Sequence, residues 1–230
     1  MPVKMVVVYY SATGTTYTLA RAVEEGATAA GAEVRVRKVR ELAPDEAIAS
    51  NQGWAAHRLE TQDVPEATLD DLEWADAIVL GTPTRYGLPT AQLKQFIDTT
   101  GPLWGAGKLV NKIASSFTSA ATTHGGHETT LAALNNTFYH WGSIIVAPGY
   151  ADPIQFASGN PYGTSFTSQN GTVKPDDTAL AAARFQGRRV TEVTAQFVAG
   201  RGAAQGGQGA APDAVGVSQG AKPEEAAARG

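Results

Sequence analysis

Three short segments rich in hydroxyl groups and glycine carry the residues in this sequence that are best suited to chemistry. The first, Ser11–Thr16, reads Ser-Ala-Thr-Gly-Thr-Thr and opens a helical pattern. Its hydroxyls and backbone amides, together with the helix dipole, suit an anion. It has neither the lysine of a triphosphate-binding loop nor the G-x-G-x-x-G spacing of a dinucleotide-binding loop. A single terminal phosphate therefore remains as the ligand, and simple helix capping by Ser11 or Thr13 is the alternative.

The other two segments combine stiffness with small side chains. Gly81–Pro89 holds Arg85 and Tyr86 between prolines and glycines, and such a rigid loop suits the edge of a planar heterocycle. An ordinary connecting loop with a solvent-facing arginine is the alternative. Thr118–Gly126 is rich in alanine, threonine and glycine, which allow a ligand to approach the backbone closely. Each segment alone is weak evidence for a ligand-binding site, so the question is whether the fold brings the three segments together.

The elements that must position these segments follow an alternating β–α pattern. Short apolar runs predict five strands, and their uninterrupted apolar interiors are typical of parallel strands buried on both faces. We expect the strands at Lys4–Tyr10, Glu33–Val39, Asp76–Gly81, Lys112–Thr118 and Ser143–Ala147. Helical periodicity and stop signals predict helices at Thr16–Ala30, from Thr90 to Gly101, at His127–Tyr139 and at Asp177–Ala199. The prediction is a doubly wound α/β fold with a five-stranded parallel sheet.

The three segments then follow the first, third and fourth strands. Ligands of open parallel sheets bind outside the carboxyl ends of the strands, where the strand order reverses. All three segments are expected at that edge, on the same side of the sheet. Their convergence is stronger evidence for one binding site than any of them alone.

Composition narrows the class of protein. The 230 residues carry 18 basic and 22 acidic side chains, a net charge of -4 that disfavours nucleic-acid binding. The absence of cysteine excludes disulfides, thiolate metal sites and cysteine nucleophiles, so any redox chemistry needs a cofactor. The sequence shows neither a secretory signal nor a membrane-length apolar stretch, and a cytoplasmic protein without membrane insertion is expected.

Three regions depart from the minimal pattern. Residues 41–75 are predicted to form a long polar connection with some irregular helix, in which His57 faces solvent. Residues 147–176 are predicted to form an aromatic-rich loop that packs on something. The Gly- and Ala-rich tail from Gly200 is predicted to be disordered. The expected organisation is thus a domain over 1–199 and a tail over 200–230.

Four motifs stand out together: Tyr9-Tyr10-Ser11 with Gly14, the run Gly81–Gly87, Gly101-Pro102-Leu103-Trp104, and His124–Thr130. They resemble the WrbA family of flavodoxin-like NAD(P)H:quinone oxidoreductases. The resemblance covers roughly residues 3–198, and the two middle motifs are its most specific parts. It implies a flavodoxin-like sheet of order 2-1-3-4-5, FMN as cofactor, NADH or NADPH as hydride donor, a quinone as substrate, and a homotetramer built as a dimer of dimers.

The resemblance also implies roles for individual residues. It assigns the phosphate to Ser11, Ala12, Thr13, Gly14, Thr15 and Thr16, and the isoalloxazine ring to Thr84, Arg85 and Tyr86. Further flavin contacts fall to Ser119, Ala120, Ala121, Thr122, Thr123, His124 and Gly125, and His140 would approach the ring. Thr13 would also contact the nicotinamide nucleotide, although family members often carry a bulkier residue there. Trp104 would wall the pocket that nicotinamide and quinone share.

The chemistry that this family implies is carried by the flavin, which accepts hydride at N5, so no catalytic side chain and no metal site are predicted. An apolar slot that takes nicotinamide and quinone in turn would give ping-pong kinetics. Tyr86 and Tyr150 are further candidates for its walls, with core or interface packing as the alternative. A one-electron carrier of the flavodoxin type is the alternative function, although such carriers are typically more acidic.

Overall fold

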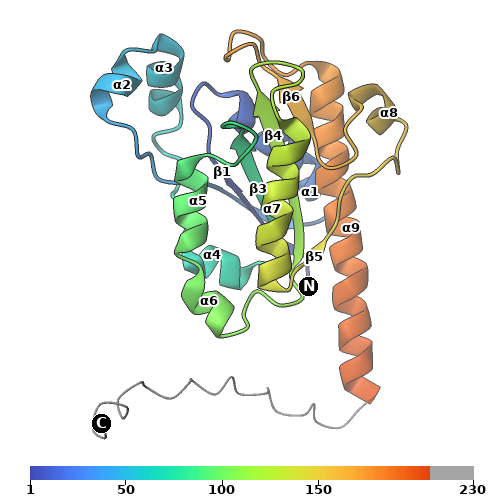
Figure 1. The fold of residues 1–230 in the computed structure, drawn as a ribbon. Helices are drawn as coiled ribbons and strands as arrows, with labels where there is room; N and C mark the ends of the chain where they lie inside the picture. The colour runs from blue at the N-terminus through green and yellow to red at the C-terminus, as the bar shows by residue number, and fades with distance from the viewer. Residues whose placement is uncertain (208–230) are drawn as a thin grey trace, which may run out of the picture. The chain divides into compact units, whose positions relative to one another are not determined.

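The computed structural model describes residues 1–207, and a parallel β-sheet lies at its centre (Figure 1). Its strands run in the order β2-β1-β3-β4-β5, which confirms the predicted order, and a further strand, β6, pairs with β4. The strand bounds are β1 Lys4–Tyr9, β2 Glu33–Lys38, β3 Ala77–Pro83, β4 Ile113–Ala120, β5 Ile144–Ile145 and β6 Ser165–Thr167.

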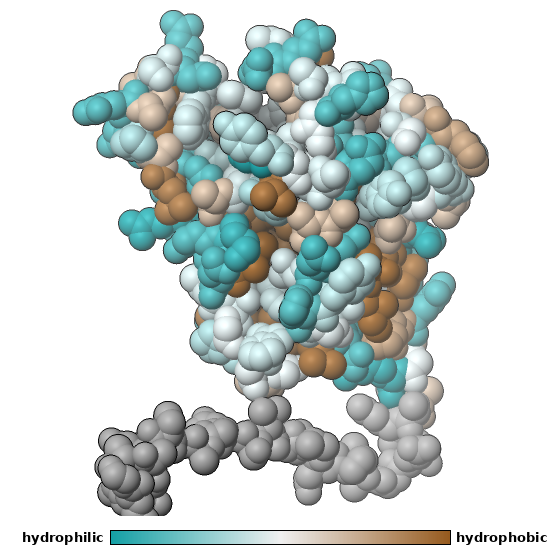
Figure 2. All heavy atoms as spheres, viewed as in Figure 1, coloured by the Kyte–Doolittle hydropathy of each residue, from teal (hydrophilic) through white to brown (hydrophobic). Residues whose placement is uncertain are grey.

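The fifth position in the sheet is shared by two separate strands. β5 pairs with Ile113 and Ala114 at the start of β4, whereas β6 pairs with the last residues of β4. The predicted strand Ser143–Ala147 is therefore too long, because β5 spans only Ile144–Ile145. The strand β6 was not predicted. Pro148, which has no backbone N–H to donate, follows this strand, and the chain leaves the sheet until Thr164. On the face seen in Figure 2, hydrophobic surface shows between α7 and α9, where the half-buried β5 forms the sheet edge.

A side chain from α9 (Asp177–Gly207) fills the gap between β5 and β6. The Gln186 amide nitrogen donates to the Ser116 carbonyl and to Ser115 Oγ, at 2.8 Å each. Its amide oxygen accepts from the Thr164 N–H at 2.9 Å. Gln186 is fully buried, so these bonds replace the backbone pairing that the interrupted strand does not provide.

Helices cover both faces of the sheet, as Figure 1 shows. On one face α1 (Thr15–Ala29) and α9 pack against alternate residues of β1, including Met5, Val7 and Tyr9. On the other face α4 (Leu69–Trp74), α5 (Ala91–Asp98), α6 (Gly101–Gly105) and α7 (His127–Trp141) pack against Val6 and Val8. The continuous apolar run of β1 is thus buried on both sides, as its sequence predicts.

Two glycines allow α1 and α9 to touch backbone to backbone. A Cβ added to Gly26 would lie 1.9 Å from the Arg184 carbonyl oxygen. A Cβ added to Gly187 would lie 2.0 Å from the Val23 carbonyl oxygen. Since no side chain fits in either place, this contact depends on glycine on both helices.

The long connections hold more regular structure than expected. The polar segment contains α2 (Asp45–Ala49), α3 (Gln52–Glu60) and α4, and the aromatic loop contains α8 (Ile154–Ser158) and β6. The prediction that His57 faces solvent is wrong, because its side chain is buried. Periodicity did not show this, since α3 has few apolar residues to define a face.

The C-terminal helix is longer than predicted. Contacts divide the chain into a unit of Met1–Val198 and a second unit that begins at Ala199. α9 continues to Gly207, so residues 200–207 of the tail predicted to be disordered are helical, and residues 208–230 lie outside the described part. No helix within residues 1–207 is long and apolar enough to cross a membrane.

A buried carboxylate fastens the second strand to α4. Asp71 accepts hydrogen bonds from Arg35 and Arg37 at 3.1 Å and from the Thr68 hydroxyl at 2.9 Å. The Arg35 guanidinium also lies 3.8 Å from the centre of the Trp74 ring. Burial acts to raise the pKa of Asp71, but the bonds from Thr68 and the two arginines outweigh it and lower that pKa.

We expect Asp71→Asn to lower the free energy of unfolding by about 2 kcal/mol near neutral pH, because charge-assisted hydrogen bonds to a buried group are lost. The lowered pKa means that the folded state favours the ionised form. This contribution is therefore complete above the unfolded-state value of about 3.9 and is lost as the pH falls through the lower folded-state pKa. Urea unfolding of both proteins along a descending pH series should show the difference shrinking; a constant difference would contradict the ionic role.

Candidate functional site

A pocket of about 420 Å³ opens at the carboxyl edge of the sheet, where the three hydroxyl-rich segments converge. From the segment after β1 it is lined by Ser11, Ala12, Thr13, Thr15 and Thr16. The segment after β3 contributes Thr84 and Arg85, and the segment after β4 contributes Ser119, Ala120, Ala121, Thr122 and Gly125. The structure thus brings together most of the residues that the sequence nominates, and we call this cavity the main pocket.

The segment after β1 begins α1 without a side-chain cap. Gly14 occupies the N-cap position with φ 96°, a left-handed conformation, and no side chain caps the helix. The Ser11 hydroxyl accepts a hydrogen bond from the Gly14 N–H at 3.2 Å and so closes the turn. Helix capping by Ser11 or Thr13 is therefore not what these residues do, and the positive end of α1 stays directed at an uncharged, hydroxyl-lined wall.

Hydrogen bonds hold the three segments in fixed relation to one another. Thr16 Oγ1 and Ser119 Oγ lie 3.1 Å apart and join the first segment to the third. The Thr84 N–H donates to the Ser119 carbonyl at 2.8 Å, and the Thr130 hydroxyl donates to the Thr84 hydroxyl at 2.7 Å. The pocket is therefore preformed by rigid loops, which reduces the entropy lost when a ligand binds.

Four predicted cofactor contacts near the pocket do not line it. The Gly14 N–H bonds to Ser11 inside the turn, and Tyr86 adopts φ 53° with a fully exposed side chain. Thr123 and His124 lie on the exposed outside of the turn after β4. Thr123 lines a separate pocket of about 330 Å³ together with His127. These residues lie beside the main pocket in the chain, but the side chains of Tyr86, Thr123 and His124 are exposed and do not line it.

Trp104 and His140 lie at the opposite edge of the sheet. The Trp104 indole N–H donates to the His140 carbonyl at 2.8 Å, beside the last turn of α7. α7 starts at the pocket, and His140 lies about 20 Å further along it at the usual helical rise. Tyr150 also lies apart from the pocket and stacks on Phe156 at 4.9 Å between ring centres. One chain by itself does not bring these predicted residues to the main pocket.

Two further segments complete the wall and were missed by sequence reasoning. Asn51 and Trp54 come from the start of α3, and Ser168, Asn170 and Gly171 come from the turn after β6. A Cβ added to Gly171 would lie 2.2 Å from Thr13 Oγ1, so this turn closes directly on the first segment. The Asn170–Gly171 pair, with φ 60° and 84°, is a turn signal that could have located it.

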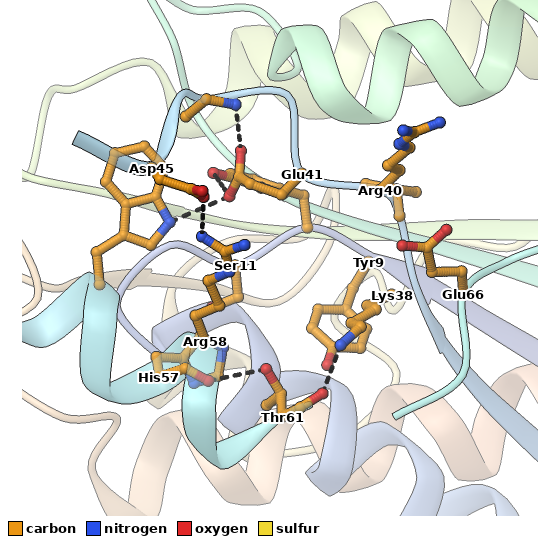
Figure 3. A pocket seen from close by; sticks show the side chains of 14 residues that line it. Tyr9, Ser11, Lys38, Arg40, Glu41, Asp45, His57, Arg58, Thr61 and Glu66 are labelled. Carbon is orange, nitrogen blue, oxygen red and sulfur yellow. Dashed lines mark hydrogen bonds and ion pairs between the residues drawn. The ribbon is translucent and has the colours of Figure 1, made fainter. Parts of the chain in front are cut away.

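An adjoining pocket of about 360 Å³ shares Ser11 and Trp54 with the main pocket (Figure 3). Glu41 organises its rim by accepting hydrogen bonds from the Tyr10 hydroxyl at 2.9 Å, Trp54 Nε1 at 3.1 Å and Gln92 Nε2 at 2.8 Å. Burial acts to raise the pKa of Glu41, but hydrogen bonds from the Ala43 amide, Gln92, Tyr10 and the Leu42 amide outweigh it and lower that pKa. The ionised carboxylate thereby holds Trp54 in the wall of the main pocket.

Comparisons with known proteins show which family and which relatives this chain resembles. The sequence profile of a family described as NADPH-dependent FMN reductase matches residues 3–155. A protein of Deinococcus radiodurans named NAD(P)H dehydrogenase (quinone) is 49% identical over 198 residues, which cover 86% of this chain and 98% of the relative. A protein of the same name from Sinorhizobium fredii is 44% identical over 200 residues, which cover 84% and 98%. A solved structure described as a flavodoxin, WrbA-like protein from Agrobacterium tumefaciens aligns with a TM-score of 0.60 and 28% identity over 85% of this chain and 99% of that one.

Proposed function

The chain belongs to the NADPH-dependent FMN reductase family, and from that premise we propose that it is an FMN-dependent NAD(P)H:quinone oxidoreductase. The observation that carries the proposal is the uncapped start of α1, with hydroxyls beside it, in a pocket between rigid loops. Such a site fits one phosphoryl group next to a flat ring. The names of the relatives and of the aligned structure support the same activity.

The residues present fit FMN in two parts. Ser11–Thr16 would hold the phosphate through hydroxyls and backbone amides, and Gly14 supplies the left-handed turn that aims these amides. The loops at Thr84–Tyr86 and Ser119–Gly125 would hold the two edges of the ring, with Arg85 as the charged side chain on that side. Thr123 and His124 would contribute backbone in this arrangement, since their side chains are exposed.

When bound, FMN supplies a two-electron acceptor that takes hydride from NADH or NADPH and passes two electrons to a quinone. The loops at Thr84–Tyr86 and Ser119–Gly125 would orient the ring, and nicotinamide and quinone would use the same space beside it in turn. This arrangement predicts ping-pong kinetics. With the hydride and one proton from water, the quinone becomes a hydroquinone, and the chain needs no side chain for the proton.

We further propose a homotetramer, a dimer of dimers, in which Trp104 and His140 of a neighbouring copy reach the main pocket. The support is that both lie far from their own pocket and that Trp104, Tyr139 and Val110 are large, exposed apolar side chains near one another in the fold. Sedimentation of the purified protein checks the number of copies. A cytoplasmic location stays a prediction from the sequence.

The activity test uses the full chain with added FMN. We expect the visible absorbance bands of bound flavin, oxidation of NADH or NADPH with benzoquinone as acceptor, and parallel double-reciprocal lines when both substrates are varied. Tight FMN binding without turnover would favour the one-electron carrier instead. Failure to bind FMN would overturn both functions.

A further inference from the structure

We propose that His57 takes part in FMN binding: its imidazolium supplies a positive charge behind the phosphate-binding segment, so that the chain distinguishes FMN from riboflavin and takes up a proton as FMN binds. The inference rests on the proposed FMN site. It concerns a residue in the polar connection, which neither the sequence motifs nor the family resemblance assigns.

His57 lies directly behind the segment that would hold the phosphate. It comes from α3, its side chain is 5% exposed, and a Cβ added to Gly14 would lie 3.5 Å from its Nδ1. Gly14 is the residue from which α1 starts. A buried ionisable group is thus packed against the backbone that carries the anion-binding amides, and it lines the adjoining pocket (Figure 3) rather than the main pocket.

The groups around His57 leave its charge state open to change. The centre of the Tyr17 ring of α1 lies 5.4 Å from the centre of the imidazole ring. The Glu60 carboxylate oxygen Oε2 of α3 lies 3.2 Å from Nδ1, at hydrogen-bonding distance. Lys38 of β2 and Tyr9 of β1 line the same adjoining pocket, and Arg40, Glu41, Asp45, Arg58 and Glu66 complete its charged rim. Burial lowers the pKa of His57, Glu60 raises it, and Lys38 lowers it, with a net lowering. The imidazole is therefore mainly neutral in the free protein at neutral pH.

The phosphate site lacks a charge of its own. Ser11–Thr16 contains no ionisable side chain, and among the described residues that line the main pocket only Arg85, on the ring side, is charged. A phosphate monoester carries close to two negative charges at neutral pH. Placing it in front of Gly14 favours the protonated form of His57 behind Gly14, because charges in a low-dielectric, buried region are weakly screened.

The negative charge of Glu60 has less effect on the phosphate-binding segment than the charge of His57 has. The Glu60 side chain is 65% exposed, so water screens its effect on the segment. The His57 side chain, in contrast, is buried against the segment at Gly14. When His57 is protonated, the pair is neutral overall and the phosphate faces an imidazolium held in place by Glu60. When His57 is neutral, the pair carries a negative charge behind the phosphate. Binding of the phosphate is thus linked to protonation of this one residue.

The direct test follows the histidine ring protons by NMR during pH titration of the protein alone, with riboflavin and with FMN. The chain has 4 histidines, so His57→Gln and His127→Gln assign the signals. We expect FMN to raise the pKa of His57 by about one unit, equivalent to about tenfold tighter binding to the protonated form, and riboflavin to leave it unchanged. Equal values with the two ligands would overturn the inference while leaving the FMN site intact.

The affinity test compares FMN and riboflavin by fluorescence quenching across the same pH range. In the unaltered protein the FMN affinity, relative to riboflavin, should rise roughly five- to tenfold on going from alkaline to mildly acidic pH. His57→Gln should lose this extra rise and keep the riboflavin affinity, which also shows that the pocket is folded. His127→Gln is the matched control, because His127 is equally buried but lines a different pocket, and it should keep the rise. Titration of the FMN phosphate itself is common to all the proteins, so it cancels when the rise in the unaltered protein is measured relative to that in His57→Gln.

These outcomes separate the two proposals. FMN binding with the same pH dependence in His57→Gln overturns the role of His57 but not the function. No FMN binding in the unaltered protein overturns both. If His57→Gln does not fold, the NMR titration of the unaltered protein decides alone, with His127→Gln and the other histidine signals as references.

Discussion

Replacing Ser11 with aspartate is expected to abolish FMN binding while leaving the cofactor-free fold as stable as before, or more so. A carboxylate oxygen can accept the Gly14 N–H as the hydroxyl does, and its charge is favourable at the uncapped start of α1. The same charge would occupy the place of the phosphate. Like charges about 4 Å apart repel by about 4 kcal/mol at the effective dielectric constant of a protein surface, so the FMN affinity should fall by about 1,000-fold.

The opposite signs of the two effects make this test diagnostic. FMN titration by fluorescence gives the affinity, and thermal unfolding without FMN gives the stability. Ser11→Ala is the control, because it removes one hydroxyl without adding charge and should weaken FMN binding by about 1 kcal/mol. If Ser11→Asp lowered the melting temperature and kept the FMN affinity, the segment would be structural and the phosphate would bind elsewhere.

Replacing Gly187 with alanine is expected to lower the free energy of unfolding by about 3 kcal/mol, the upper end of the usual cost of overpacking. The new methyl group would lie 2.0 Å from the Val23 carbonyl oxygen, and both partners belong to helix backbones that cannot move aside singly. Urea unfolding measures the change. The loss should appear with and without FMN, because this contact lies between α1 and α9 rather than in the pocket.

The matched control lies on the same helix. Gly200 is also in α9, but nothing lies within 4 Å of a Cβ added there. Gly200→Ala should therefore be neutral or stabilising by up to about 1 kcal/mol through helix propensity. A loss of less than about 0.5 kcal/mol for Gly187→Ala would show that α1 and α9 separate easily and that the close contact adds little to stability.

The sheet and the place of the site could be predicted because the relevant signals are local and strong. The apolar runs of β1 and β3 are short and rich in β-branched residues, which favours buried strands over helices, and the buried core on both faces of β1 confirms this. Once the strands are ordered, the segments that follow them must meet at one edge. The main pocket holds most of the residues nominated in this way, including Thr16 and Ser119, which touch.

What sequence reasoning missed depends on contacts between distant segments. His57 and Trp54 belong to a polar stretch whose burial comes from packing on α1 and from Glu41, and no period in the sequence records that. β6 has only three residues, too few for a pattern, and its place is set by β4 and Gln186. Trp104 and His140 were nominated by resemblance alone, and within one chain they lie away from the main pocket.

The split edge of the sheet has a consequence for how this fold can diversify. β4 and Gln186 hold the chain at Val146 and again at Thr164, so the two anchor points stay fixed whatever lies between them. The exposed positions between these anchors, such as Tyr150, Phe156 and Tyr162, can therefore exchange amino acids over generations without shifting the register of any strand. Gly163 cannot, because a Cβ added there would lie 2.2 Å from the Ser116 carbonyl oxygen. Natural variation and deliberate loop grafting should both concentrate there, giving relatives new outer surfaces around an unaltered catalytic edge.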